Sequence, residues 1–242
     1  MLVSFIIPAH NECAGIEATI RSIRQAANQA QLRHEIVVAD DSSDDGTGDV
    51  ALEVGATVVR IEARHISAAR NAGAAASHGE ALIFVDADTV VNAEVVRAAV
   101  NALQSGAVGG GARVRFDEPV PLWCRLLMPI VMWSYQRAKF AAGCFVFCSR
   151  SAFHAAGGFD EQVFAGEEVE LSRALAKLGT MAMLREHVTT SGRKLRTHSV
   201  WAMLALLVRY AVKGRRMVEQ REGLELWYGP RRDDARAGRK GA

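Results

Sequence analysis

The sequence predicts an α/β protein whose central sheet is mostly parallel and is covered by helices. Three observations lead to this prediction. Short strand-like runs alternate with longer helical patterns over about the first hundred residues, several of the runs are apolar throughout, and a polar cluster directly follows three of them. Strands that are apolar along their whole length are typical of a sheet that is buried on both faces.

The N-terminal half contains four expected strands with three expected helices between them. The strands cover residues 2–8, 35–39, 57–61 and 81–85, and the helices cover about 14–31, 46–54 and 66–78. Ile16, Ile20 and Ile23 recur at helical spacing and give the first helix one apolar face. This alternation predicts Rossmann-like βα units joined by right-handed connections.

The C-terminal half is less regular. We expect a helix near 92–104, a strand after 108–111, an apolar region over 120–140, a strand at 143–149, a turn at 157–160 and a helix at about 167–178. A chain of 242 residues is long enough to bury one sizeable core. The sequence therefore predicts a single domain over residues 1–200, with residues 1–105 and 106–200 as its two halves.

The segment 201–228 is first apolar and then basic. Its run 201–212 predicts a helix of about twelve residues, whereas a helix that crosses a bilayer needs ~20. Lys213, Arg215 and Arg216 follow, so we expect residues 201–216 to bind a membrane surface reversibly. Residues 229–242 are rich in Gly, Arg and Asp and are expected to form a flexible tail.

Composition argues against several partners and compartments. The formal net charge of +2 produces no field of the kind that nucleic-acid-binding proteins carry. The four cysteines show no disulfide framework, and the N-terminus lacks the basic start and long apolar run of a signal peptide. These features predict a cytoplasmic protein that can associate with the inner face of the membrane and does not bind nucleic acid.

Polar clusters follow the first, second and fourth expected strands. They comprise Pro8, Ala9, His10, Asn11 and Glu12 after the first strand, Asp40 and Asp41 after the second, and Asp86, Ala87 and Asp88 after the fourth. Open α/β sheets bind their ligands beyond the carboxyl ends of the strands. We therefore expect the three clusters to line one ligand site.

Asp86 and Asp88 are the residues most suited to a metal site. Carboxylates spaced i and i+2 at the end of a strand can point in the same direction. Mg²⁺ is bound in proteins by one or two carboxylates and completes its shell with substrate phosphates, and Mg²⁺ or Mn²⁺ offsets the charge of a departing diphosphate. The alternative is a solvated turn, because this short pattern is common.

Further acids and one arginine are also candidate functional residues. Asp40 and Asp41 are able to accept hydrogen bonds from a base or a ribose, whereas Asp44 or Asp45 is expected to cap the helix that begins near residue 46. Arg70 suits a diphosphate or a carboxylate, with a solvated arginine as the alternative. Glu167 and Glu168 open a helix, where acids are also favoured by the helix dipole alone, and either carboxylate is able to act as a general base.

These residues lie in motifs that resemble, in order, those of family 2 glycosyltransferases. The motifs are IIPAHNE at 6–12, VVADDSSDDGT at 37–47, ARNAG at 69–73, FVDAD at 84–88, GGFD at 157–160 and GEE at 166–168. Each motif is weak by itself, but their order over residues 3 to about 180 is specific. The resemblance implies a GT-A fold, with residues 1–105 as the nucleotide-binding half and residues 106–200 as the acceptor half. It also implies an inverting hexosyltransferase-like mechanism, and a UDP- or GDP-sugar donor with Mg²⁺ or Mn²⁺.

The resemblance also implies roles for individual residues. Residues of the nucleotide-sugar pocket would be Pro8, Ala9, His10, Asn11, Glu12, Asp40, Asp41, Arg70, Asn71, Asp86, Ala87 and Asp88, with Asp86 on the ribose or base and Asp88 on the metal. Glu168 would be the base, in a position where the family usually has aspartate. Arg193 or His198 would contact the diphosphate, with a solvated basic loop as the alternative.

Two departures from the family pattern are informative. Ser42 stands where glycine is usual, which puts the geometry of the second loop in question. The Gln-x-x-Arg-Trp motif and the membrane-spanning helices of processive synthases are not found in the sequence, so transfer of a single sugar is favoured. The acceptor is unidentified, and the apolar content of 120–147 admits a lipid-linked one as well as an ordinary packed helix.

Other classes of function fit less well. Nucleotidyl transfer normally needs a glycine-rich loop with a basic residue after the first strand, and a nicotinamide dehydrogenase needs G-x-G-x-x-G there; residues 8–12 match neither. A non-catalytic protein that binds sugar nucleotides, or a partner subunit, stays open because of the substitution at Glu168. Turnover of sugar nucleotides separates this alternative from an enzyme.

Overall fold

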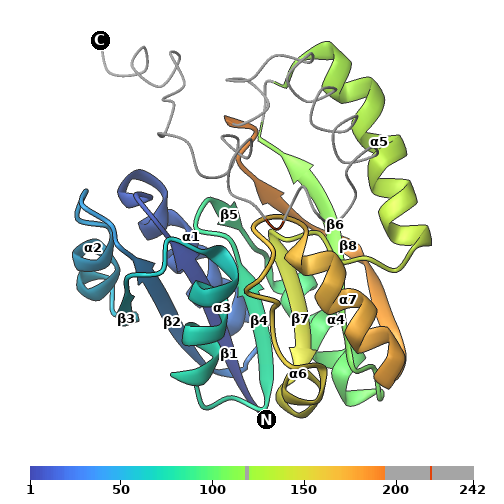
Figure 1. The fold of residues 1–242 in the computed structure, drawn as a ribbon, viewed down its shortest axis with the longest axis horizontal. Coiled ribbons are helices and arrows are strands. Elements are labelled where there is room, and N and C mark those ends of the chain that lie inside the picture. Colours follow the sequence, from blue (N-terminus) through green and yellow to red (C-terminus); the bar gives the residue numbers. More distant parts are fainter. Residues whose placement is uncertain (118–119, 194–218, 220–242) are drawn as a thin grey trace.

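The computed structural model describes residues 1–117, 120–193 and Glu219. The expected helix at 201–212, the membrane-binding segment 201–216, the tail 229–242 and His198 lie outside the described residues. Within the described part, the chain forms a central sheet with helices on both faces (Figure 1). This arrangement confirms the predicted α/β class.

The N-terminal half follows the expected alternation closely. Its strands are β1 (Leu2–Ala9), β2 (Arg33–Asp41), β3 (Thr57–Ile61) and β4 (Ala81–Val85), and its connecting helices are α1 (Cys13–Gln29), α2 (Thr47–Glu53) and α3 (Ile66–Ala75). The four strands pair in parallel in the order β3-β2-β1-β4. Their carboxyl ends therefore meet at one edge of the sheet.

The complete sheet is mixed. It has eight strands in the order β3-β2-β1-β4-β7-β6-β8-β5, and the added strands are β5 (Thr89–Val90), β6 (Gly109–Phe116), β7 (Phe145–Ser149) and β8 (Met181–Thr190). β7 is antiparallel to both β4 and β6, whereas β8 is parallel to β6. β8 and the short β5 were not expected from the sequence, and their pairing brings the end of β8 next to the residues that follow β4.

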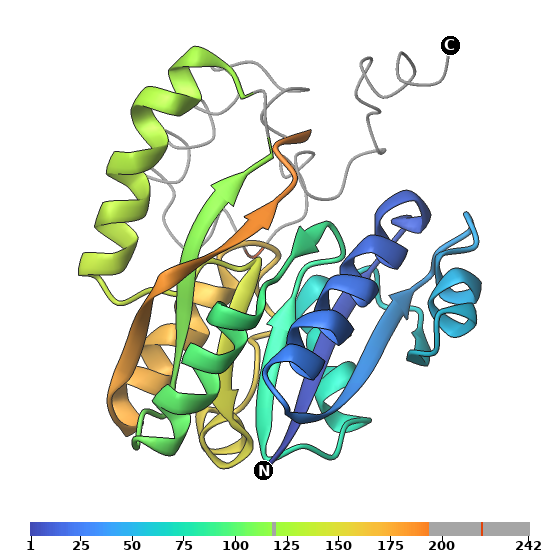
Figure 2. The ribbon, with the colours of Figure 1, turned by 180° about the vertical axis from the view of Figure 1, so that it is seen from behind.

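Helices cover the two faces in separate groups. Ile16 and Ile20 of α1 and Val95 of α4 (Ala93–Gln104) belong to one core cluster, on the face seen in Figure 2. Phe153 of α6 (Arg150–Ala156) and Leu171 of α7 (Glu167–Leu178) belong to a second cluster, beside α3 on the face seen in Figure 1. Burial on both faces explains why the central strands are apolar throughout.

The glycines of β6 allow close packing in the middle of the sheet. A Cβ atom on Gly110 would overlap the backbone carbonyl oxygen of Ala182 in β8. A Cβ atom on Gly109 would lie 2.7 Å from the carbonyl oxygen of Phe147 in β7. Side chains at these positions would separate β6 from its neighbours, so the glycine run is a packing requirement.

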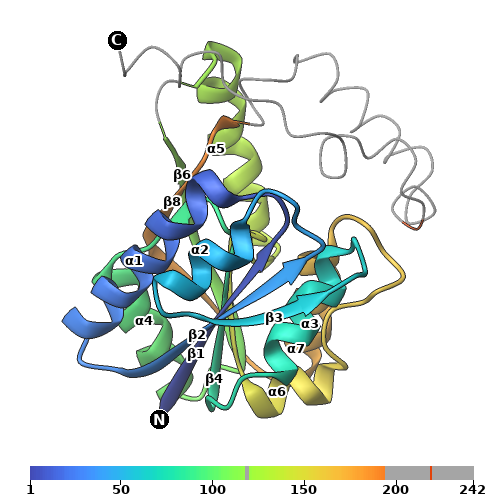
Figure 3. The ribbon, with the colours of Figure 1, turned by 90° about the vertical axis from the view of Figure 1, so that its left-hand side faces the viewer.

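The helix α5 (Leu122–Arg137) occupies the apolar region expected at 120–140. It does not lie flat on the sheet but stands beside the C-terminal end of β6 (Figure 3). Among the described residues, no helix is long and apolar enough to span a bilayer.

Candidate functional site

The loops that follow β1 and β2 are joined to each other by hydrogen bonds. The backbone N–H of Asn11 donates to Ser43 Oγ at 3.0 Å, and the N–H of Asp44 donates to Asn11 Oδ1 at 3.0 Å. The N–H of Glu12 donates to Thr47 Oγ1 at 2.9 Å. Two of the predicted polar clusters therefore form one continuous rim.

Asp45 has the structural role that was predicted for Asp44 or Asp45. Its carboxylate accepts hydrogen bonds from the N–H of Cys13 at 3.0 Å and from the N–H of Thr47, at the start of α2, at 3.0 Å. Burial opposes ionisation, but these hydrogen bonds and one from the Thr47 hydroxyl outweigh it and lower the pKa of Asp45. Ser42, which replaces a usual glycine, has a φ of 59°, in the left-handed region that glycine adopts most easily.

The Asp41 carboxylate binds backbone N–H groups, whereas its position after β2 led us to expect contact with a ligand. Its Oδ1 atom accepts from the N–H groups of Ala63 at 2.9 Å and Arg64 at 2.7 Å, and its Oδ2 atom accepts from the N–H of His65 at 2.7 Å. The residue is only 4% exposed. Asp41 therefore fixes the loop between β3 and α3, and its carbonyl oxygen lies 2.7 Å from Nδ1 of His10.

Asp40 lines a hollow of about 380 Å³. The hollow is bounded by the end of β2, the start of α2 and the end of β3, and its lining includes Ser43, Gly48 and Arg60. A Cβ atom on Gly48 would overlap the Asp40 carboxylate. Of the two adjacent aspartates, Asp40 is thus the one whose side chain faces a space that a ligand could fill.

Asp86 and Asp88 have different partners although they are two residues apart. Asp86 Oδ1 accepts from Arg70 Nη2 at 2.9 Å, whereas Asp88 Oδ1 accepts from the hydroxyl of Thr190 at 3.3 Å. Between them, the carbonyl oxygen of Ala87 accepts from Thr19 Oγ1 of α1 at 2.8 Å. Both carboxylates are half-buried at the end of β4, close to the end of β8.

The oxygen chemistry of Asp88 fits a hard divalent cation. No group of three or more His, Cys, Asp or Glu side chains that could hold a metal ion occurs among residues 1–117 and 120–193. Protein ligands from this part of the chain would therefore fill only some of the six positions around an octahedral ion. Phosphate oxygens of a substrate would supply others, as in sites built on one or two carboxylates.

Arg70 lies beneath the site and joins two of its acidic segments. Its guanidinium donates to Asp86, to the carbonyl oxygen of Gly143 at 3.0 Å and, through Nη1, to Glu167 Oε1. It is 1% exposed and stacks over the ring of Phe159, with 5.0 Å between Cζ and the ring centroid. Burial by itself would lower the pKa of Arg70, but Glu167 and Asp86 raise it above its ordinary value.

Substitution of Arg70 tests this structural role. We expect Arg70→Met to lower the free energy of unfolding by about 3–5 kcal/mol, because it leaves Glu167 buried without its counter-charge. Arg21→Met is the matched control, since Arg21 is exposed in an i,i+4 pair with Glu17 and should contribute less than about 0.5 kcal/mol. Urea denaturation measures both, and equal losses in the two variants would contradict the proposed role.

Glu167 and Glu168 are adjacent at the start of α7 but face different surroundings. Glu167 is 5% exposed and is paired with Arg70, so it serves as the buried anchor. Glu168 is half-buried, and its carboxyl carbon lies 3.6 Å from where a Cβ atom of Gly143 would be. Burial and the adjacent Glu167 carboxylate raise the pKa of Glu168 to about 8. Of the two predicted bases, Glu168 has the properties of a proton acceptor.

Asn71 also has a partner different from the expected one. Its amide donates to the carbonyl oxygen of Phe159 at 2.9 Å and to Glu161 Oε1 at 2.7 Å, and its Oδ1 atom accepts from the N–H of Phe159 at 2.9 Å. These bonds use both sides of the amide to hold the turn at 157–160. The side chain therefore supports the loop before α7 instead of pointing to a ligand.

Arg193 reaches the first loop from the far end of the domain. Its guanidinium pairs with the Glu12 carboxylate through two contacts, Nη2 to Oε1 at 2.9 Å and Nη1 to Oε2 at 3.4 Å. The connection depends on β8, whose last residue, Thr190, contacts Asp88. Asp117 joins the same region by accepting from the N–H of Gly192. Sequence reasoning missed Thr190 and Asp117, because neither lies in a recognisable motif.

Comparisons with known proteins agree with this arrangement. A family model described as Glycosyl transferase family 2 matches residues 4–157. The chain is 27% identical over 221 residues to a protein of Bacillus subtilis named Probable glycosyltransferase YdaM, an alignment that covers 82% of this chain and 52% of the relative. It is 31% identical over 129 residues to a Dolichol-phosphate mannosyltransferase of Pyrococcus furiosus, covering 51% of this chain and 36% of that protein.

A solved structure confirms the expected fold. The structure of a mannosyltransferase from Pyrobaculum calidifontis in complex with GDP-Man and Mn²⁺ superposes with a TM-score of 0.65 at 18% identity. The superposition covers 88% of this chain and 64% of that one. The chain thus has the GT-A-type α/β arrangement, while it spans about half the length, or less, of these two curated relatives.

Proposed function

The chain belongs to glycosyl transferase family 2, and we propose that it transfers one sugar, with inversion, from a nucleotide diphosphate sugar to a hydroxyl group of an acceptor. One observation carries the proposal. Asp40 and Asp88 follow strands, and Glu168 opens a helix, so acids from three segments distant in sequence lie around one edge of the sheet. Arg70 links the segments that bear Asp88 and Glu168, because it pairs with Asp86 and with Glu167.

The donor would bind along the rim formed by the first two loops. Asp40, which faces the hollow, would accept hydrogen bonds from the base or ribose. Arg193, held near the first loop by Glu12, would contact the diphosphate, and its planar guanidinium suits two phosphate oxygens. Asp41, Arg70 and Asn71 would shape this pocket from behind through the backbone and ion-pair contacts described above.

Asp88 would hold Mg²⁺ or Mn²⁺ together with phosphate oxygens of the donor. When bound, such an ion would act as a Lewis acid that offsets the negative charge of the departing nucleoside diphosphate. The presence of Mn²⁺ and GDP-Man in the similar Pyrobaculum structure supports this assignment. Asp86 would stay bound to Arg70 and orient the end of β4 on which Asp88 sits.

Glu168 would remove the proton from the acceptor hydroxyl. As the proton moves to the Glu168 carboxylate, the acceptor oxygen forms a bond with the anomeric carbon from the face opposite the diphosphate. The bond between that carbon and the diphosphate oxygen breaks, and its electron pair leaves with the nucleoside diphosphate. The configuration at the anomeric carbon is thereby inverted.

The raised pKa of Glu168 predicts a pH dependence of turnover. Only the ionised carboxylate accepts a proton, and its fraction grows as the pH rises through about 8. We therefore expect kcat to increase from pH 6 through about 8 and to level off only above about pH 9, where most of the carboxylate is ionised. A pH profile measured at saturating donor tests this, with Glu170→Gln as a control that should keep the profile. A flat profile over that range would argue against Glu168 as the base.

A panel of UDP-, GDP- and dTDP-sugars with Mn²⁺ tests the function itself. Release of nucleoside diphosphate, alone or with an added acceptor alcohol, is expected for one donor class. Tight nucleotide binding without turnover of any donor would favour the alternative of a non-catalytic binding protein or partner subunit. The acceptor is unassigned, and a lipid-linked acceptor finds support in the names of relatives such as the Pyrococcus protein and in the apolar helix α5.

A further inference from the structure

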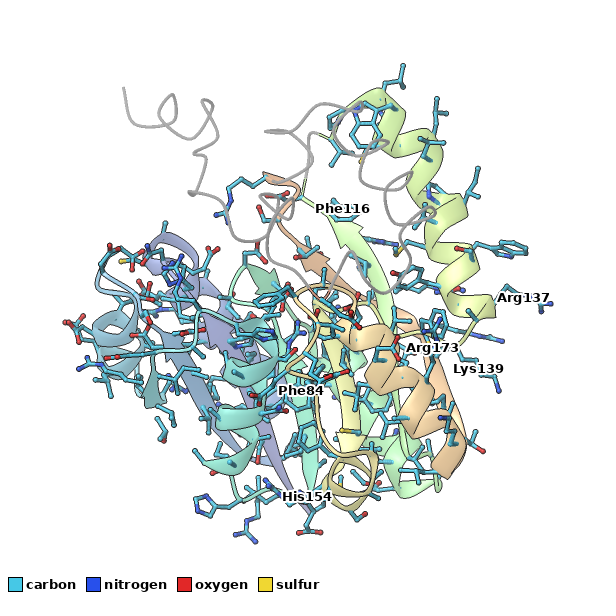
Figure 4. All side chains as sticks on the ribbon, in the orientation of Figure 1. Phe84, Phe116, Arg137, Lys139, His154 and Arg173 are labelled. Atoms are coloured by element: carbon cyan, nitrogen blue, oxygen red, sulfur yellow. The ribbon has the colours of Figure 1, made fainter. Side chains whose placement is uncertain are left out.

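The helix α5 carries an exposed apolar stripe. Leu122, Leu126, Ile130 and Trp133 are 71%, 65%, 63% and 63% exposed. Their spacing of four, four and three residues places them on one side of the helix. Because all four side chains are largely exposed, the stripe forms a solvent-facing surface. Figure 4 shows that α5 carries side chains that point away from the sheet.

The stripe is bordered only by positive charge within its own segment. Between residues 120 and 143 the sequence has no Asp or Glu, and its charged residues are Arg125, Arg137 and Lys139. All three are exposed, and none forms an ion pair with a carboxylate in the part of the chain that the structure describes. Arg137 and Lys139 lie together at the end of α5 that is nearer α7 (Figure 4).

A groove beside the stripe adds two further cations. It has a volume of about 520 Å³ and lies between α5 and β6. Arg113, Arg115 and Arg125 line it together with apolar side chains that include Phe116 and Trp133. An apolar groove bearing guanidinium groups suits an amphiphile with an anionic head, because arginine binds phosphate oxygens through two N–H groups.

The position of α5 relates this surface to the proposed site. The strand before it ends at Phe116, which is paired with Thr190, and the Thr190 hydroxyl donates to Asp88. After the helix, the N–H of Ala141 donates to Ser172 Oγ of α7 at 3.1 Å, and Arg173 lies over the ring of Phe140. α5 thus links the metal-site end of the sheet to the helix that carries Glu168.

We propose that α5 is an interfacial helix that docks the protein on an anionic lipid surface. Its stripe of Leu122, Leu126, Ile130 and Trp133 enters the boundary between headgroups and acyl chains, while the flanking arginines and Lys139 bind lipid phosphates. A helix with leucine and tryptophan on one side and only basic charges beside it has the properties of such an element. With 16 residues the helix is shorter than the ~20 needed to cross a bilayer, so it lies on the surface. In this orientation the acceptor half of the protein faces the membrane.

Vesicle sedimentation tests the proposal without relying on sugar transfer. Wild type, Leu126→Glu and Ile130→Glu are compared on vesicles of phosphatidylcholine with phosphatidylglycerol and on phosphatidylcholine alone. We expect wild type to bind the anionic vesicles, and each variant to lower the partition coefficient by about tenfold or more, since a charge replaces an inserted side chain. Leu52→Glu is the matched control, because Leu52 is a 50% exposed leucine on α2, and it should bind like wild type.

Four results would overturn the proposal. Absence of wild-type binding would show that the protein does not dock on such a surface. Unchanged binding of Leu126→Glu would place the membrane contact elsewhere, such as residues 201–216. Conversion of a dimer to a monomer by Leu126→Glu, measured by analytical ultracentrifugation, would identify the stripe as a surface between two copies. A loss of stability much larger than that of Leu52→Glu would show that the chain itself covers the stripe. Hydrolysis of the donor should be the same in all variants, so a failure of docking and a failure of the proposed function are distinguishable.

Discussion

Replacement of Asp88 with alanine is expected to abolish metal-dependent sugar transfer while the protein stays folded. The carboxylate would bind the ion that offsets the charge of the leaving diphosphate, and such stabilisation is worth several kcal/mol in the transition state. We expect kcat/KM to fall by at least about a thousandfold, since each 1.4 kcal/mol is about tenfold. Turnover is measured against Mn²⁺ concentration, and nucleotide binding is measured with and without the ion.

Asp86→Asn provides the informative comparison within the same motif. Asp86 neutralises the buried Arg70, so this variant should lose about 1–3 kcal/mol of unfolding free energy, more than a substitution at Asp88 does. Glu17→Gln, on the exposed face of α1, controls for the loss of a charge in general. Metal-stimulated turnover that survives in Asp88→Ala would remove the metal role from this residue.

Glu168→Gln is expected to lower kcat by about a hundredfold to ten-thousandfold, the range for loss of a general base. Glutamine has nearly the same shape but cannot take the proton from the acceptor. The Michaelis constant for the donor should change little, because Glu168 faces the acceptor side in the proposed mechanism. Steady-state kinetics with saturating donor separate the two parameters.

The same substitution has an expected effect on stability. A carboxyl whose pKa is raised by folding stabilises the native state below about 4.5 and loses that contribution as the pH rises through about 8. Glu168→Gln should therefore be as stable as wild type or more stable at pH 8. Two neighbouring residues serve as controls. Glu167→Gln should destabilise the protein, because Glu167 pairs with the buried Arg70. Glu170→Gln should change the stability little, because Glu170 pairs with Arg173 at the surface. If all three variants retain full activity, the base lies elsewhere.

The fold was more predictable in its first half than in its second. β1, β2 and β4 follow from apolar runs that two neighbouring layers of helices bury, and such a pattern depends on nearby residues only. β8 was not expected, because its segment 181–190 lacks the alternation of a typical strand: four apolar residues are followed by Arg185, Glu186 and His187. Its partner β6 lies about seventy positions earlier in the chain. The orientation of β7, antiparallel between β4 and β6, likewise depends on contacts that no local pattern encodes.

The site residues show a similar division. The residue types and their order placed Asp40, Asp86, Asp88 and Glu168 among the functional residues, and the structure leaves each of them at the expected edge. The partners of Asp41, Arg70 and Asn71 differ from the expected ones. A carboxylate, a guanidinium or an amide has the same hydrogen-bonding capacity toward a ligand as toward backbone, so the residue type alone cannot distinguish the two.

The amino-acid sequence was enough to predict that this chain forms βα units, that acidic loops follow its strands, and that its motifs are those of one family. These properties are local, since they depend on the apolar period of each segment and on a few consecutive residues. Three features became visible in the folded chain alone: Arg70 joins Asp86 to Glu167, Arg193 pairs with Glu12, and α5 presents an apolar stripe beside a groove lined by arginines. Ion pairs and exposed faces depend on which distant segments the folded chain brings into contact, and that is a property of packing.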